Sequence, residues 1–180
     1  MATYVSMLRG VNVGGAGKVK IGELKRLYES LGLEAVRTYI QSGNLVFRSP
    51  IRSAGALSST LERGILDEFG LDVTVILRTG QELEKLVLRN PFVKATPRET
   101  DKMHVTFLSD LPKPQAVAAL SLSPGGRDRY EISGKEIFLY CPDGYGRTKL
   151  NNNALETKLG VRATTRNWAT VTRLLEMARE

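Results

Sequence analysis

The feature that most constrains the fold of this chain is the order in which strand and helix patterns follow one another. From residue 3 to residue 78 that order is strand, helix, strand, strand, helix, strand. It is the order of a split β-α-β arrangement, in which the first two strands run parallel with the third antiparallel between them. Residues 1–80 are therefore predicted to form a ferredoxin-like subdomain. The expected elements are strand 3–9, helix 21–31, two strands within 34–49 that turn at Ser42-Gly43, helix 54–69 and strand 72–78.

The same order returns after a connector at residues 81–101, where two prolines break a short helix that follows Gly80. We therefore predict an α+β fold: a ferredoxin-like β-α-β-β-α-β first half, a second, similar α+β half over residues 102–180, and a C-terminal helix. No repeat is visible at the level of single residues. The elements expected in the second half are strand 103–108, helix 114–120, strands 130–133 and 136–140, helix 152–159 and a short strand at 161–163.

The C-terminal helix has a start signal in its sequence. Thr164 or Thr165 is expected to cap it, which puts Arg166 and Asn167 in its first turn. An arginine there opposes the helix dipole, so we expect a carboxylate, a carbonyl or an anionic ligand beside it. The apolar side chains that should face the core are Trp168, Val171, Leu174 and Leu175.

Composition indicates a globular protein with an uneven charge distribution. Of the 180 residues, 42% are hydrophobic and 25% are charged, and no apolar stretch reaches the ~20 residues of a membrane span. We therefore expect a cytoplasmic location and no membrane partner. The net charge of +7 divides into +5 for residues 1–52, −2 for 53–146 and +4 for 147–180. Two basic ends favour an anionic partner, although solvated surface charge accounts for them equally well.

Cysteine and histidine usage excludes several kinds of site. Cys141 is the single cysteine and His104 the single histidine, so an intrachain disulfide is impossible and no metal site is predicted. Any nucleophilic pair or triad would have to use His104, which lies in an apolar strand pattern. We expect Cys141 to be a small buried side chain, and no cofactor is indicated.

A glycine-rich loop, "LRGVNVGGAGKVK", joins the first strand to the first helix. It fails the P-loop pattern, because Ala16 and Gly17 stand where Lys and Ser or Thr are required, and it also lacks G-x-G-x-x-G spacing. Its glycines still allow successive backbone N–H groups to turn toward an anion beside a helix start. A tight strand-to-helix connection is the simpler explanation of the same glycines.

Topology should bring this loop beside the hairpin turn "QSGN", with Arg9 and Asn12 facing residues 41–44 across one end of the sheet. Neither segment contains a carboxylate, so the rim suits an anion and lacks an evident general base. A second group of donors lies near the C-terminus. The predicted ligand-binding residues are Arg9, Gly10, Asn12, Gly14, Lys18, Gln41, Ser42, Asn44, Arg166 and Asn167.

Several of these segments together resemble the bacterial family called domain of unknown function 1697. The segments are "LRGVNVGG", "ELKRLYESLG", "VRTYIQSGNLVF" and "TKLNNNALETKLGVRATTRNW". The resemblance spans Tyr4 to Leu175 and implies a ferredoxin-like α+β architecture in two subdomains, with no established activity. It assigns motif positions to Arg9, Gly10, Asn12 and Gly14 in the loop, to Gln41, Ser42, Gly43 and Asn44 in the hairpin, and to Thr165, Arg166, Asn167 and Trp168 at the C-terminal helix.

The leading functional hypothesis is a cytoplasmic protein that binds a phosphate-like or nucleotide-like small molecule at the N-terminal rim. Nucleic-acid binding is an alternative, although the third strand "NLVFRS" has one aromatic residue, where RNA-recognition modules carry several. An enzyme acting on a phosphorylated substrate is another alternative, and it lacks a convincing acid, base or metal set. An adaptor without a small ligand completes the alternatives.

Overall fold

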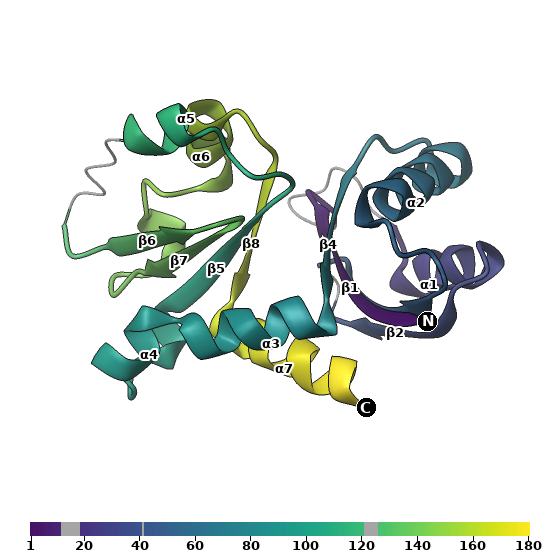
Figure 1. Cartoon of the computed structure of the whole chain (residues 1–180), viewed down its shortest axis with the longest axis horizontal. Helices are drawn as coiled ribbons and strands as arrows, with labels where there is room; N and C mark the ends of the chain where they lie inside the picture. Colours follow the sequence, from purple (N-terminus) through teal and green to yellow (C-terminus); the bar gives the residue numbers. More distant parts are fainter. Residues whose placement is uncertain (12–18, 41, 121–125) are drawn as a thin grey trace. The chain divides into compact units, whose positions relative to one another are not determined.

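The structure is a computed structural model that describes residues 1–11, 19–40, 42–120 and 126–180. It consists of two compact units, Met1–Glu84 with Leu174–Glu180, and Lys85–Arg173. Helices α3 (Gly80–Arg89) and α7 (Trp168–Arg179) both continue from one unit into the other (Figure 1). The last seven residues, expected in the second subdomain, therefore belong to the first unit.

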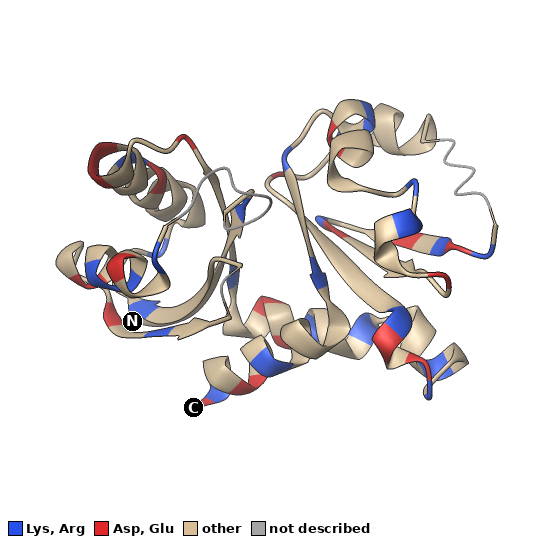
Figure 2. Cartoon of the chain, turned by 180° about the vertical axis from the view of Figure 1, so that it is seen from behind, with Lys and Arg blue, Asp and Glu red and all other residues tan. Residues whose placement is uncertain are grey.

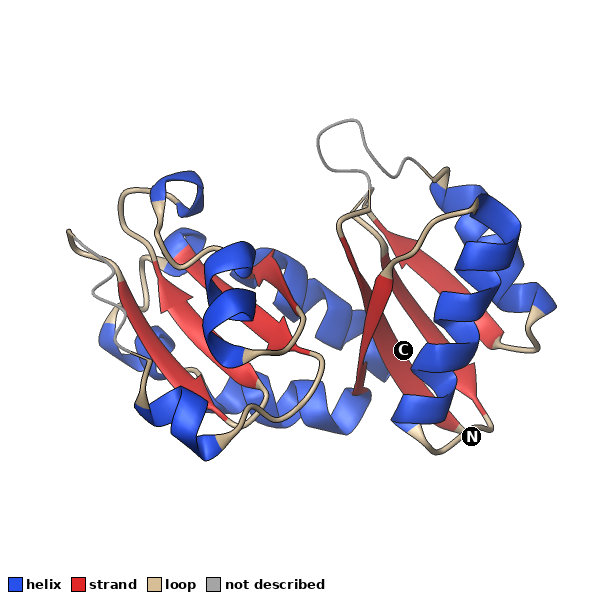
Figure 3. Ribbon diagram, turned by 90° about the horizontal axis from the view of Figure 1, so that it is seen from above, coloured by secondary structure: helices blue, strands red, loops and turns tan. Residues whose placement is uncertain are grey.

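The sheet of the first unit has the strand order β2-β3-β1-β4 with every neighbouring pair antiparallel. Its strands are β1 (Ala2–Arg9), β2 (Glu34–Tyr39), β3 (Asn44–Ser49) and β4 (Thr74–Thr79). Because β3 runs antiparallel to both β1 and β2, the first two strands are parallel and the predicted ferredoxin-like topology is confirmed. Helices α1 (Ile21–Ser30) and α2 (Ala54–Phe69) cover one face of the sheet (Figure 3).

The core of this unit lies between the sheet and its two helices. Alternate strand residues point to the helices, and apolar positions at helical spacing meet them. Tyr28 of α1 is fully buried, where its ring meets Phe47 edge-on at 5.4 Å and its hydroxyl bonds with Ser6 Oγ at 3.2 Å. Burial raises the pKa of the Tyr28 hydroxyl. The main core residues are Tyr4, Leu8, Leu24, Tyr28, Leu45, Phe47, Leu57, Leu61, Ile65, Val75 and Leu77.

The second unit contains a sheet of the same order, β6-β7-β5-β8, again antiparallel throughout. Its strands are β5 (Met103–Leu108), β6 (Arg129–Ser133), β7 (Glu136–Tyr140) and β8 (Ala163–Asn167), and its apolar core includes Leu108, Ile137, Leu139 and Leu155. The predicted similarity of the two halves is confirmed in strand order. The remaining elements are the helices α4 (Pro91–Ala95), α5 (Pro114–Ala118) and α6 (Asn152–Leu159) and the 3-10 turns η1 (Thr100–Lys102) and η2 (Tyr145–Arg147).

Strand register reveals a residue-level repeat that the sequence alone does not show. Val5 of β1 pairs with Arg78 of β4, and Val105 of β5 pairs with Arg166 of β8. Each of these arginines is buried and donates from Nη1 to the carbonyl of the preceding residue, at 2.8 Å for Arg78 and 3.0 Å for Arg166. The two halves therefore correspond position by position along their central strands.

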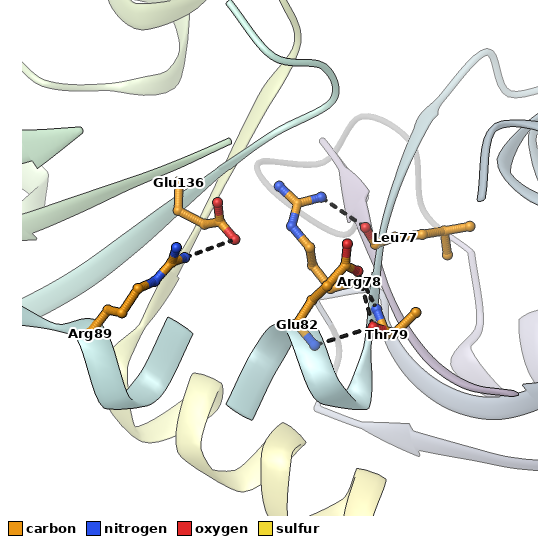
Figure 4. A network of polar contacts seen from close by, with 6 residues as sticks. All are labelled: Leu77, Arg78, Thr79, Glu82, Arg89 and Glu136. Atoms are coloured by element: carbon orange, nitrogen blue, oxygen red, sulfur yellow. Dashed lines mark hydrogen bonds and ion pairs between the residues drawn. The ribbon is translucent and has the colours of Figure 1, made fainter. Parts of the chain in front are cut away.

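The last strand of each half leads directly into a capped helix. In the first half, Glu82 N–H donates to Thr79 Oγ1 at 3.2 Å, and Thr79 N–H donates to the Glu82 carboxylate at 2.7 Å (Figure 4). This reciprocal pair is a capping box at the start of α3. Farther along α3, within the second unit, Arg89 approaches the Glu136 carboxylate at 3.8 Å (Figure 4).

The predicted start of the C-terminal helix is wrong, because a short strand occupies the residues that were expected to begin the helix. Residues 163–167 form β8, and α7 begins at Trp168. Thr165 pairs with Thr106 of β5, and their hydroxyls are 2.7 Å apart. The helix is capped by Asn167, whose Oδ1 accepts the Thr170 N–H at 2.8 Å. Arg166 and Asn167 therefore lie in the strand, not in the first turn of the helix.

Candidate functional site

The hairpin turn between β2 and β3 packs directly on the end of β1. Leu8 N–H donates to the Gly43 carbonyl at 3.0 Å, and Met7 pairs with Asn44 in the sheet register. Gly43 has φ +73°, and a Cβ there would lie 2.9 Å from Leu8 Cβ and 3.5 Å from Val11 Cβ. Glycine is therefore required at this contact for both backbone conformation and space. Gly43 was not among the predicted ligand-binding residues, although the Ser-Gly-Asn sequence indicates a tight turn that needs glycine at this position.

Arg9 and Gly10 lie where β1 ends beside this turn. Arg9 is the last residue of β1, pairs with Thr74 of β4 and is half-buried. Gly10 follows it, is exposed and has φ +79°. The segment that contains them is thus held against the hairpin through the Leu8–Gly43 contact. Asn12, Gly14, Lys18 and Gln41, which were predicted as ligand-binding residues, lie outside the described residues.

Asn44 and Ser42 organise the hairpin turn from inside. The Asn44 amide donates from Nδ2 to Ser42 Oγ at 2.8 Å and to the Tyr39 carbonyl at 3.2 Å. Asn44 is fully buried, whereas Ser42 is half-buried. The Asn44 side chain thus links Tyr39, at one end of the turn, to Ser42 near the other end. Its structural role is a finding that the spacing of residues in the sequence did not indicate.

Arg166 and Asn167 belong to the second unit. Arg166 is buried and donates from Nη1 to Thr164 Oγ1 at 2.7 Å and to its neighbour's carbonyl at 3.0 Å. Burial lowers the pKa of its guanidinium to about 10, because removal from water destabilises the charged form. Asn167 is exposed and its side chain caps α7. Both residues therefore have defined structural roles in the second half.

The single histidine and cysteine also lie in the second unit. His104 of β5 stacks on the ring of Tyr145, with the ring centroids 4.8 Å apart, and burial lowers its pKa. Cys141 is buried, and desolvation raises the pKa of its thiol to about 11. In the part of the chain that the structure describes, no group of three His, Cys, Asp or Glu residues is arranged to hold a metal ion.

One hollow in the described part of the first unit lies between α1 and α2. It has a volume of about 590 Å³ and is lined by residues of α1 and α2 that include Glu23, Arg26 and Glu68. Figure 2 shows both acidic and basic positions along these two helices. With two carboxylates against one guanidinium, the hollow does not suit an anion.

Each half of the molecule is a ferredoxin-like α+β unit, and in the first the Ser-Gly-Asn hairpin turn packs on the end of β1. A family model described as "Protein of unknown function (DUF1697)" matches residues 1–138. The chain belongs to this family, as the sequence motifs predicted.

A solved structure shares the fold over the whole chain. The conserved bacterial protein SP0830 from Streptococcus pneumoniae is similar with a TM-score of 0.80 and 26% sequence identity, and the alignment covers 100% of this chain and 99% of that chain. A search of curated proteins finds no match. Among the described residues, no helix is both long enough and apolar enough to span a membrane.

Proposed function

We propose that this protein binds an anionic small molecule, phosphate-like or nucleotide-like, at the rim formed by residues 9–10 and 42–44. The observation that carries the proposal is the packing of the hairpin turn on the end of β1, through the 3.0 Å bond from Leu8 N–H to the Gly43 carbonyl. This contact keeps the Arg9 segment and the Ser42 segment together although they are far apart in sequence. A cationic group beside hydroxyl and backbone N–H donors is the usual composition of an anion site.

The two segments that form the rim contain no carboxylate, which supports an anion. No Asp or Glu occurs from residue 9 to residue 22 or from residue 35 to residue 61. The second half provides a natural comparison, because its Leu108 N–H donates to the Lys135 carbonyl at 2.8 Å in the same way. There, Asp110 follows the strand and Glu136 occupies the position of Asn44. Carboxylates at the equivalent positions make the second rim unsuitable for the same ligand.

The proposal includes a cytoplasmic location. The lone Cys141 is buried and unpaired with any other cysteine, and such thiols are stable in reducing compartments.

Nucleic-acid binding is the weaker alternative, because the aromatic residues of the two central strands of the first sheet are used in its core. Phe47 of β3 and Tyr4 of β1 are both buried, with ring centroids 6.1 Å apart, on the side of the sheet that meets the helices. RNA-recognition modules of this topology instead stack bases on exposed sheet aromatics. An affinity for duplex or single-stranded nucleic acid that falls steeply with salt concentration would favour this alternative.

The proposal is tested by measuring the binding of phosphate, pyrophosphate and nucleotides to the wild type and to Arg9→Gln. The substitution removes a charge while keeping a side chain of similar length, and we expect the dissociation constant to rise about tenfold or more. Arg52→Gln is the matched control, because Arg52 is an exposed arginine of the same unit outside the rim. Equal affinities of wild type and Arg9→Gln, or no binding of any of these anions, would overturn the proposal.

A further inference from the structure

Ile40 has an unusual combination of conformation and exposure. It lies in the turn between β2 and β3, has φ +50°, and leaves 51% of its surface exposed. Left-handed backbone is disfavoured for β-branched residues, and Asn or Gly is the ordinary choice at such a position. An exposed Ile side chain contributes little to the core. Folding stability therefore does not explain why isoleucine occupies this position.

The turn around Ile40 is held from both ends. The Asn44 amide donates to the Tyr39 carbonyl and to Ser42 Oγ. Tyr39 precedes Ile40 directly, and Ser42 lies two residues after it. An apolar side chain is thus presented next to Tyr39, whose carbonyl the Asn44 amide holds. Strain that a surrounding structure maintains at an exposed position is characteristic of ligand contacts.

We infer that the ligand of the rim is a nucleotide whose base packs on Ile40 while its phosphate is held beside Arg9. This inference rests on the proposed anion site and specifies its ligand class. A bare phosphate would make no use of an exposed aliphatic side chain, whereas a nucleobase has a flat face that such a side chain covers. Contact between the two removes apolar surface from water and adds affinity to the anion interaction.

The test compares nucleotides with the same anion lacking a base. Dissociation constants are measured by calorimetry for AMP, GMP, CMP, UMP and ribose 5-phosphate, with wild type, Ile40→Gly and Ile40→Asn. We expect at least one nucleotide to bind wild type about tenfold more tightly than ribose 5-phosphate, equivalent to about 1.4 kcal/mol. In both variants the dissociation constants of that nucleotide and of ribose 5-phosphate should differ by less than about threefold. The dissociation constant of ribose 5-phosphate itself should stay unchanged. Because Gly and Asn accept the left-handed conformation, both variants should fold.

Leu66→Gln is the control, since Leu66 is another exposed apolar residue of the first unit, at 47% exposure on α2, and its replacement should leave the ratio intact. An unchanged ratio in the Ile40 variants, or nucleotides that bind no better than ribose 5-phosphate, would overturn this inference. If ribose 5-phosphate then still binds in an Arg9-dependent manner, the anion site itself stands. Absence of binding by all five compounds would overturn this inference, and absence of phosphate and pyrophosphate binding as well would overturn the anion site.

Discussion

Gly43 occupies a position with no room for a side chain. Alanine there combines left-handed backbone with a Cβ 2.9 Å from Leu8 Cβ, so we expect Gly43→Ala to lower the free energy of unfolding by about 2–4 kcal/mol. Gly32 is the matched control, because it has φ +82° with nothing within 4 Å of an added Cβ. Gly32→Ala should cost about 1–2 kcal/mol in the same urea titration. Equal losses in the two variants would show that the close contact with Leu8 carries no cost.

Cys141 should react slowly in the native protein. Its thiol is buried and its pKa is raised to about 11 from 9.0. At neutral pH this shift reduces the thiolate fraction about 100-fold relative to an unshifted thiol. We expect disulfide reagents to modify Cys141 at least 100-fold more slowly in native protein than in urea. Equal reaction rates before and after unfolding would contradict this prediction.

The raised pKa of the Cys141 thiol also predicts that the free energy of unfolding falls between about pH 9 and pH 11. The reason is that the thiol of the unfolded chain loses its proton at lower pH than the buried thiol does. Cys141→Ala should therefore show a smaller fall over the same pH range.

At the residue scale, the sequence predicted that the end of β1 and the hairpin turn lie together, and it did not predict the roles of individual residues there. The pairing of the loop with the hairpin follows from topology, and the structure places Gly43 against Leu8 as that topology requires. The role of Asn44 as a bridge within the turn depends on short contacts that spacing does not encode. Burial of Arg166 depends on its register opposite Val105, which is a long-range property of the second sheet.

At the scale of elements, the cap of α7 is the clearest test of where that helix begins. Asn167→Ala removes the acceptor of the Thr170 N–H, so we expect a loss of about 0.5–2 kcal/mol in the free energy of unfolding. Asn167→Asp keeps an acceptor at the same place and should retain most of the stability. The measurement is urea unfolding followed by circular dichroism. A loss as large in the aspartate variant as in the alanine variant would argue against capping by this side chain.

The extents of the main elements were predictable because their patterns are long and their ends are marked. Helix 54–69 ends before Gly70 and helix 152–159 before Gly160, and both glycines adopt the left-handed conformation that ends a helix. The boundary between β8 and α7 was not predictable in this way. Threonine is common both at helix caps and in strands. Here Thr165 pairs with Thr106 of β5, so this segment forms a strand.

At the scale of the whole molecule, the end of α7 should stabilise the first unit in particular. Arg37 of β2 donates to the Met177 carbonyl and pairs with Glu180, and Arg179 pairs with Glu84 of α3. Deletion of residues 177–180 should therefore speed hydrogen exchange in β2 and at the start of α3, while β6 and β7 keep their protection. Glu180→Gln is the control that removes one charge alone. Uniformly faster exchange in both units would contradict this assignment.

The division of the chain between the units has a consequence for its synthesis. Residues 1–84 emerge from the ribosome before Lys85–Arg173, yet the segment Leu174–Glu180 that completes their unit emerges after it. The second unit is an insertion within the first, and its 89 residues are contiguous in the chain. During translation the later unit can close while the earlier one still lacks its final helical turns. The first unit is thus completed only after the whole of the second unit has been synthesised.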